Sequence, residues 1–215
     1  MSVPADKRTR RDERRRSLGQ NFLRPDLAAS LVAGAAFVAG DRVVEIGAGR
    51  GALTYALARR GVRVEALEKD PRWAASLRRG VSERGLHDVS VVCCDALDYR
   101  APRRPFRLVG SLPFGSTTAI LRHFLDDPES ALVRADLIVQ WEVARKRAVM
   151  PPSTLLSATW APWWVFDMGR RIPAAAFRPV PSVDAAVLRV TRRDPPILPL
   201  RMAGPYATFV RRQWQ

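Results

Sequence analysis

The chain has 215 residues, a length that suits one domain with a small appendage. Hydrophobic residues make up 47% and aromatic residues 8% of it, which excludes a disordered chain, and its apolar runs are too short to cross a bilayer. Thirty-six basic residues against 21 acidic residues give a net charge of +15, and this surplus indicates a polyanionic partner, with nucleic acid as the first candidate.

Residues 1–16 carry seven basic and three acidic side chains and almost nothing apolar. This composition predicts a flexible basic arm, which can also seek phosphates. No apolar signal region follows the charged start, so we expect the protein in the cytoplasm.

From residue 41 onward, short apolar runs alternate with helix-like segments. The pattern predicts five strands, within residues 41–49, 62–70, 89–97, 106–114 and 135–143. It predicts helices within residues 52–61, 70–80 and 116–127, with Gly61 and Gly80 ending the first two, and Asp70 and Ser116 as N-caps. This alternation is typical of an α/β fold with a mostly parallel sheet and helices on both faces.

The last part of the chain departs from this alternation. Two further strands, within residues 160–172 and 182–190, are joined by a short Pro-rich segment, which suits an antiparallel hairpin at the sheet edge. Residues 195–215 read as a Pro-rich linker and the start of a basic helix. We therefore expect a main domain over residues 17–192, and over 193–215 a linker with the stub of a smaller C-terminal helical domain.

A cofactor site is indicated where the first strand turns into a helix, in EIGAGRGA (45–52). Gly47 and Gly49 let the backbone approach a ligand, although this spacing also fits the dinucleotide fingerprint and leaves NAD as an alternative. Glu68 ends the next strand, where it can bind ribose hydroxyls, and Asp95 ends the third, where it can accept from an adenine amino group. Glu45, just before the glycines, favours a cationic ligand, so the set matches S-adenosylmethionine better than NAD.

Metal chemistry is not indicated. Cys93 and Cys94 are adjacent and point to opposite faces of a strand, which disfavours a disulfide between them, and His87 and His123 lie far apart. We expect no metal site.

Five segments occur in a characteristic order: GQNFL (19–23), EIGAGRG (45–51), CCDAL (93–97), GSLPF (110–114) and FRPVPSVDAAVL (177–188). With them the chain resembles the ribosomal RNA adenine N6-methyltransferases, and most of all the Erm type, which confers macrolide resistance by modifying large-subunit rRNA. The resemblance runs from about residue 18 to 190. It implies a Rossmann-like class I methyltransferase fold, S-adenosylmethionine as cofactor, and a monomer that acts on 23S rRNA before the ribosome is fully assembled, with no membrane and no metal.

The resemblance also implies roles for individual residues. Those implied to bind the cofactor are Gln20, Asn21, Leu23, Glu45, Gly47, Gly49, Glu68, Asp95, Ala96 and Ser111. The catalytic motif corresponds to Ser111, Leu112, Pro113 and Phe114, in which the first side chain and the carbonyl of Leu112 accept hydrogen bonds from the adenine amino group. Phe114 and Phe177 correspond to the aromatic residues that stack on the target base.

Ser111 departs from the family, which has Asn at this position. A hydroxyl can accept the same hydrogen bond but is shorter and less rigidly oriented than a carboxamide, so we predict reduced turnover rather than none. Two alternatives stay open: a small-subunit rRNA adenine dimethyltransferase, which shares these motifs, and a non-catalytic RNA-binding relative. A DNA adenine methyltransferase fits the segment 177–188 less well.

Overall fold

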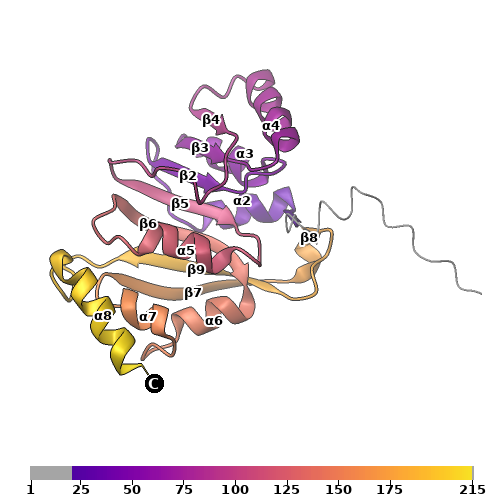
Figure 1. Ribbon diagram of the computed structural model, residues 1–215. Coiled ribbons are helices and arrows are strands. Elements are labelled where there is room, and N and C mark those ends of the chain that lie inside the picture. The colour runs from indigo at the N-terminus through magenta and orange to yellow at the C-terminus, as the bar shows by residue number, and fades with distance from the viewer. Residues whose placement is uncertain (1–20, 215) are drawn as a thin grey trace, which may run out of the picture.

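The structure is a computed structural model that describes residues 21–214, and a seven-stranded sheet runs through its centre (Figure 1). The strand order is β4-β3-β2-β5-β6-β9-β7. The first five strands in this order are parallel to one another, and β9 runs antiparallel to both of its neighbours, β6 and β7. The bounds are β2 (Arg42–Ile46), β3 (Arg63–Leu67), β4 (Val89–Val92), β5 (Phe106–Ser111), β6 (Leu132–Gln140), β7 (Trp164–Ile172) and β9 (Ala185–Arg192). The predicted parallel sheet with an antiparallel edge hairpin is confirmed.

Helices cover both faces of the sheet and bury two apolar layers against it. On one face lie α2 (Pro25–Ala33), α3 (Ala52–Ala58) and α4 (Pro71–Glu83), and on the other α5 (Thr117–Leu125), α6 (Trp141–Ala148) and α7 (Leu155–Trp160). Leu57 of α3 and Leu77 of α4 pack with Val43 in the first layer, whereas Phe124 of α5 packs with Leu108 in the second. All five of these side chains are almost fully buried, which fixes the sheet between the helices.

Helix α4 begins as predicted but continues past Gly80. The Asp70 side chain accepts a hydrogen bond from the backbone N–H of Arg72 at 2.9 Å, which confirms it as the N-cap. Gly80 does not end the helix, so that prediction is wrong. A Cβ atom at Gly80 would lie 2.3 Å from Oη of Tyr55, so a larger residue there would displace the end of the Tyr55 side chain. Gly85, with a φ of +61°, follows the true end of the helix.

Other boundaries also differ from the sequence pattern. The third strand ends at Val92 and the fifth at Gln140, and α6 begins directly at Trp141. The helices α2, α6 and α7 were not predicted, because helices of 9, 8 and 6 residues are too short to show a clear helical period in the sequence. Ser116 is the N-cap of α5, as predicted, but its side chain makes no capping hydrogen bond.

A second, two-stranded sheet joins the two ends of the main domain. Strand β1 (Phe22–Leu23) pairs antiparallel with β8 (Phe177–Arg178), which follows the short helix η1 (Ala174–Ala176). The residue pairs are Phe22 with Arg178 and Leu23 with Phe177. Residues 22–23 and 177–178 are far apart in the sequence, and this pairing places them side by side beside the carboxyl ends of the parallel strands (Figure 1).

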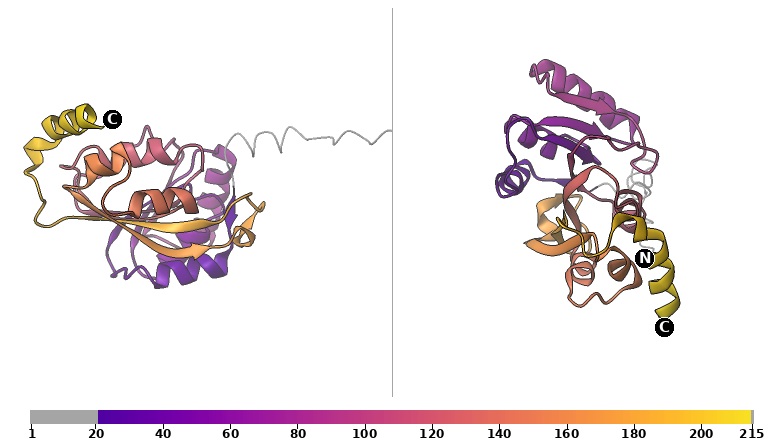
Figure 2. Two further views of the ribbon diagram at one scale, coloured as in Figure 1. Left: turned by 90° about the horizontal axis from the view of Figure 1, so that it is seen from below. Right: turned by 90° about the vertical axis from the view of Figure 1, so that its left-hand side faces the viewer.

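The last described segment forms η2 (Leu200–Met202) and α8 (Ala203–Gln213). Tyr206 of α8 packs edge-on against Trp163, with ring centroids 5.8 Å apart, and its hydroxyl donates to the carbonyl oxygen of Ala158 in α7. Helix α8, at the yellow end of the colour scale, lies on the side of the molecule away from β8 (Figure 1 and Figure 2). Among residues 21–214, no helix combines the length and the apolarity that a membrane crossing requires.

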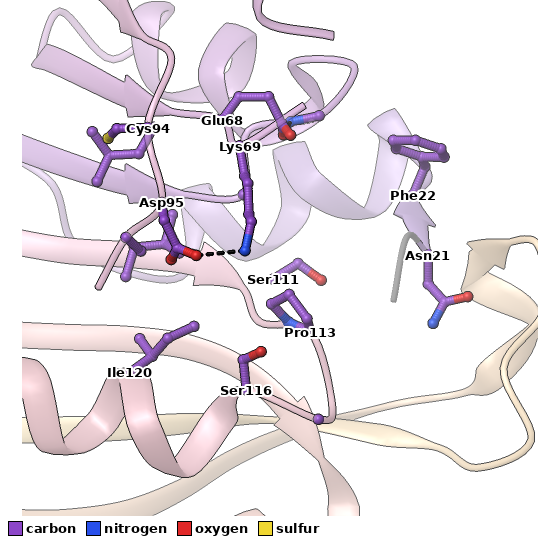
Figure 3. Close-up of a pocket in the computed structure, with 16 residues that line it drawn as sticks. Asn21, Phe22, Glu68, Lys69, Cys94, Asp95, Ser111, Pro113, Ser116 and Ile120 are labelled. Atoms are coloured by element: carbon purple, nitrogen blue, oxygen red, sulfur yellow. Dashed lines mark hydrogen bonds and ion pairs between the residues drawn. The ribbon is translucent and has the colours of Figure 1, made fainter. Parts of the chain in front are cut away.

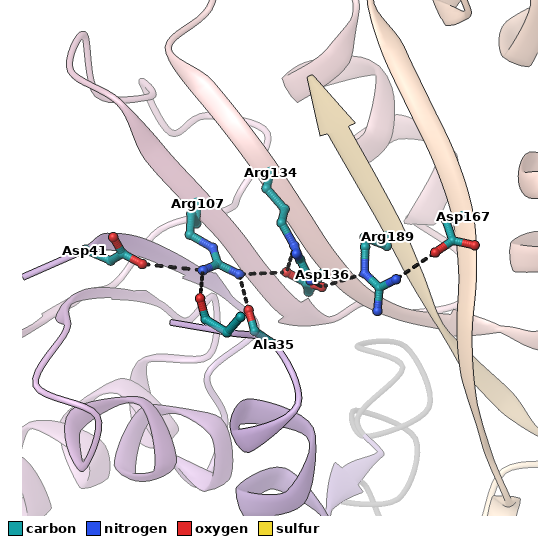
Figure 4. Close-up of polar contacts among 8 residues, drawn as sticks. Ala35, Asp41, Arg107, Arg134, Asp136, Asp167 and Arg189 are labelled. Atoms are coloured by element: carbon teal, nitrogen blue, oxygen red, sulfur yellow. Dashed lines mark hydrogen bonds and ion pairs between the residues drawn. The ribbon is translucent and has the colours of Figure 1, made fainter. Parts of the chain in front are cut away.

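A cluster of charges ties α2 to the middle of the sheet (Figure 4). Asp136 of β6, only 9% exposed, pairs with Arg134 at 2.7 Å, Arg107 at 3.3 Å and Arg189 at 3.6 Å. Arg107 also donates to the carbonyl oxygen of Ala35 at 2.6 Å, just beyond the end of α2. Since α2 directly follows β1 (Phe22–Leu23), this cluster helps to hold β1 in place beside the sheet.

Candidate active site

The carboxyl ends of β2, β3, β4 and β5 border one cavity of about 230 Å³ (Figure 3). In open α/β sheets ligands bind at this edge, where the strand order reverses. The cavity is lined by Asn21, Phe22, Ile46, Gly47, Gly49, Leu67, Glu68, Lys69, Cys94, Asp95, Ala96, Ser111, Pro113, Gly115, Ser116 and Ile120. Seven of the ten residues expected to bind a cofactor thus line one cavity.

The glycine loop packs closely against its protein neighbours. Gly47 and Gly49 have φ angles of +70° and +54°, a region that side chains disfavour. A Cβ atom at Gly47 would lie 3.3 Å from the carbonyl oxygen of Ser111, and one at Gly49 would lie 3.0 Å from the ring of Phe22. The loop therefore leaves bare backbone facing the cavity, where a ligand can approach it.

Glu68 is a buried carboxylate that braces this loop. Its two oxygens accept the backbone N–H groups of Gly49 and Asp70, each at 2.7 Å. Burial, the largest effect, raises the pKa of Glu68, and the two backbone hydrogen bonds oppose that rise. Because a carboxylate has about four acceptor positions, Glu68 can still accept from two ribose hydroxyls.

Asp95 lies across the cavity in a more open position. One oxygen accepts the backbone N–H of Leu97 at 3.0 Å, and the other pairs with Nζ of Lys69 at 2.5 Å (Figure 3). The Leu97 hydrogen bond, followed by that from Lys69, lowers the pKa of Asp95. The Lys69 side chain is 62% exposed, so its flexible end can move away. The Asp95 carboxylate is then free to accept a hydrogen bond from an adenine amino group.

Glu45 does not line the main cavity. Its side chain is 1% exposed and accepts a hydrogen bond from the Thr54 hydroxyl at 2.6 Å. Burial raises the pKa of Glu45 to about 7. It borders a small adjoining cavity of about 30 Å³ beneath the glycine loop, together with Leu23. Both residues were predicted to touch the cofactor, and the structure places them one layer behind the main cavity wall.

The segment 110–115 forms the opposite wall. Leu112 is 2% exposed, and its backbone N–H donates to the carbonyl oxygen of Ile138 at 2.9 Å, so both its side chain and its peptide are fixed. The N–H of Ser116 donates to the carbonyl oxygen of Pro113 at 3.0 Å and closes a turn. Within this turn Phe114 is half-buried, between two residues of the wall.

Phe177 lies elsewhere. Its ring is 1% exposed in the apolar layer under α2 and α3, and it does not line the cavity. In this arrangement Phe177 has no free ring face on which a base could stack, because its strand β8 is paired with β1. Gln20, also expected at the cofactor, lies outside the described residues.

The cavity also contains residues that sequence reasoning missed. Ile46, Leu67 and Cys94 each precede a predicted site residue at a strand end, so the same strand-end argument could have found them. Ile120 comes from α5, and no motif marks it. Among residues 21–214, no group of three or more His, Cys, Asp and Glu side chains is arranged to hold a metal ion.

The donor set fits S-adenosylmethionine. The cavity offers a carboxylate for the ribose, a second for the adenine, apolar side chains for the flat ring and a bare glycine backbone for the methionine part. A nicotinamide dinucleotide needs a pyrophosphate site at the helix N-terminus, but the buried Glu45 and Glu68 carboxylates surround this loop.

Comparisons with known proteins agree with this geometry. Residues 11–214 match the protein family described as ribosomal RNA adenine dimethylase. An rRNA adenine N-6-methyltransferase of Corynebacterium diphtheriae is 38% identical over 89% of this chain and 74% of the relative. The mycinamicin-resistance protein MyrB of Micromonospora griseorubida is 39% identical over 92% of this chain, which spans 62% of the length of that relative. The crystal structure of the 23S rRNA methyltransferase ErmE superposes with a TM-score of 0.79 at 34% identity, over 89% of this chain and 78% of that one.

Proposed function

This chain belongs to the ribosomal RNA adenine dimethylase family, and from that premise we propose that it is an S-adenosylmethionine-dependent methyltransferase of the Erm type. It methylates N6 of an adenosine in large-subunit (23S) rRNA and thereby confers resistance to macrolide-type antibiotics. The likeness to MyrB and to ErmE supports this choice over the small-subunit enzymes.

The observation that carries the proposal is the set of residues that line one cavity. Gly47, Glu68, Asp95 and Ser111 all line this cavity. These residues belong to four different strand ends, so only the fold brings them together. In the proposed complex Glu68 holds the ribose and Asp95, with the Ala96 backbone, holds the adenine of the cofactor.

Bound S-adenosylmethionine supplies an electrophilic methyl group. The chain's own task is to present the adenine amino nitrogen, whose lone pair is delocalised into the ring. The Ser111 hydroxyl and the Leu112 carbonyl oxygen accept hydrogen bonds from its two N–H groups and turn the lone pair toward the methyl group. The buried side chain and the bonded N–H of Leu112 hold that carbonyl in position. Phe114 offers a surface for the target base, and such stacking is worth about 1–3 kcal/mol.

The substrate, partners and location follow from the same proposal. The target base must leave its stack to reach the cavity, which favours RNA that is not yet covered by ribosomal proteins. The basic segment 1–16 and the basic helix near the C-terminus supply charge for RNA binding. We propose a monomer that acts in the cytoplasm without a metal ion.

The test is methyl transfer from labelled S-adenosylmethionine to protein-free 23S and 16S rRNA, followed by mapping and mass analysis of the modified nucleoside. Label in an N6-methylated adenosine of 23S rRNA is the expected result. Ser111→Ala should lower the rate, whereas Ser153→Ala, an exposed serine outside the cavity, should leave it unchanged.

Three other outcomes contradict the proposal. Label in 16S rRNA identifies the small-subunit enzyme. Calorimetric binding of S-adenosylmethionine without transfer to either RNA contradicts the proposed catalysis. No cofactor binding at all identifies a non-catalytic RNA-binding relative.

A further inference from the structure

A second cavity lies behind the cofactor site, on the other side of β1, and five of its eleven lining residues are arginines. It has a volume of about 400 Å³. Its walls come from β1, the start of α2, the exposed side of α3, the end of α4 and β8. The lining residues are Phe22, Leu23, Arg24, Pro25, Arg50, Ala52, Tyr55, Arg59, Arg84, Leu86 and Arg178. We call this cavity the arginine cleft.

The positive charge of the arginine cleft is largely uncompensated. Within the described part of the chain, no acidic residue lines it. Among the described residues, only Arg24 of the five arginines has a carboxylate partner, Asp26 at 2.9 Å. All five arginines are exposed. By contrast, the arginines around the buried Asp136 share its carboxylate, so their charge is partly compensated.

Aromatic rings hold two of the guanidinium groups. Arg50 lies over Phe22 at 4.7 Å and over Trp73 at 5.0 Å, and Arg84 lies over Tyr55 at 4.7 Å, measured to the ring centroids. A stacked guanidinium keeps its N–H groups at the edge of its plane, directed away from the ring. The cleft thus has donors that are partly fixed in advance, in the planar arrangement that suits phosphate oxygens.

The position of the arginine cleft links it to the reaction. Phe22 lines both the cofactor cavity and the cleft, and Arg178 of the cleft pairs with Phe22 across the small sheet. An RNA strand whose target base enters the cofactor cavity therefore has neighbouring phosphates close to β1 and β8. Turning a base out of its stack distorts the backbone on either side of it, so contacts to those phosphates favour the extruded state.

We propose that the arginine cleft binds the sugar-phosphate backbone of the RNA next to the target adenosine. This inference rests on the proposed function for the identity of the RNA. A single small phosphate ligand needs two or three converging donors, whereas here the charge is spread over five residues from separate elements. That distribution fits several phosphates in succession along a strand.

The test compares two double variants that remove the same charge. Arg59→Gln/Arg84→Gln changes the cleft, and Arg60→Gln/Arg79→Gln changes two exposed arginines outside it. The probe is the fragment of 23S rRNA that the wild-type chain binds most tightly in filter binding, chosen without regard to methylation. Affinity is measured from about 0.05 to 1 M salt, a range over which phosphate contacts are screened, and thermal unfolding checks that each variant is folded.

Each lost phosphate contact reduces the slope of log affinity against log salt by about 0.7. The cleft variant should therefore lose about 1.4 in slope and bind about 25-fold more weakly at about 0.1 M salt, with wild-type affinity approached near 1 M. The control variant should change much less. If the cleft variant unfolds, Arg59→Gln alone serves, with an expected loss of about 0.7 in slope and about fivefold in affinity.

Equal changes in the two double variants, or no change in either, overturn the inference. Its failure is distinct from failure of the proposed function. A wild-type chain that transfers no methyl group, but whose RNA affinity still depends on the cleft, refutes the proposed activity and leaves the cleft as an RNA site.

Discussion

Replacing Glu45 with glutamine should make the protein more stable at alkaline pH, although Glu45 lies next to the cofactor loop. The carboxyl group is 1% exposed, with the Thr54 hydroxyl bonded to it at 2.6 Å. Burial raises its pKa from 4.5 to about 7. The unfolded chain therefore ionises Glu45 at a lower pH than the folded chain does.

The sign and size of the effect follow from this difference. Between pH 4.5 and 7 the folded state binds more protons than the unfolded state, so the free energy of unfolding falls as the pH rises. Each pKa unit corresponds to about 1.36 kcal/mol, so the rise of the pKa from 4.5 to about 7 removes about 3 kcal/mol by about pH 8.5. At about pH 5 the loss is under about 1 kcal/mol. The glutamine side chain of the variant would not ionise, and its amide oxygen could still accept from Thr54.

The measurement is urea unfolding of the wild type and of Glu45→Gln at about pH 5, 7 and 8.5. The stability of the variant relative to the wild type should rise by about 2–3 kcal/mol over this pH range. Glu142→Gln is the control, because Glu142 is exposed and its pKa is lowered by a hydrogen bond from Arg145. Its difference from the wild type should stay constant over this range. A Glu45→Gln difference that is equally constant would falsify the reasoning.

Three further predictions concern the cofactor cavity and the core. Ser111→Asn should raise the methyl-transfer rate about fivefold, as expected for about 1 kcal/mol from one better-aimed hydrogen bond, and an unchanged or lower rate in single-turnover assays contradicts this. Asp95→Ala should weaken S-adenosylmethionine binding about tenfold or more in calorimetry, because an acceptor for the adenine amino group is lost, whereas Asp98→Ala, an exposed neighbour, should not; equal losses would refute the role of Asp95. Gly110→Ala should lower the free energy of unfolding by about 1–3 kcal/mol, because its Cβ would lie 2.6 Å from the backbone carbonyl oxygen of Ile46 in the neighbouring strand β2. Gly115→Ala, whose Cβ would meet nothing within 4 Å, is the control in urea unfolding, and an equal loss in the two variants would show that the clash is not the cause.

Much of the site was predictable from local patterns. Gly47, Glu68, Asp95 and Ser111 each lie at the end of an apolar run that reads as a strand. The ends of parallel strands meet at one sheet edge, so the sequence could place these residues together before any contact was known. The cavity confirms that they lie around one space.

How deeply each of these side chains is buried was not predictable in the same way. Glu45 and Glu68 are both acidic residues beside the glycine loop, yet Glu68 borders the main cavity and Glu45 lies beneath the loop. Side chains alternate across a strand, and only the packing of α3, through Thr54, shows which layer Glu45 occupies. The same holds for Phe177, whose motif indicates a role at the target base but whose ring is buried by the pairing of β1 with β8.

The sequence by itself determined the fold class, the order of the strand ends and the chemistry of the residues there, because these depend on hydrophobic period and residue type. Only the tertiary structure decided that Gly80 lies inside α4 against the Tyr55 hydroxyl, that Glu45 is buried, and that five arginines from separate elements form one cleft. These features arise from contacts between segments that are distant in the sequence, and no local pattern in the chain records which of them meet.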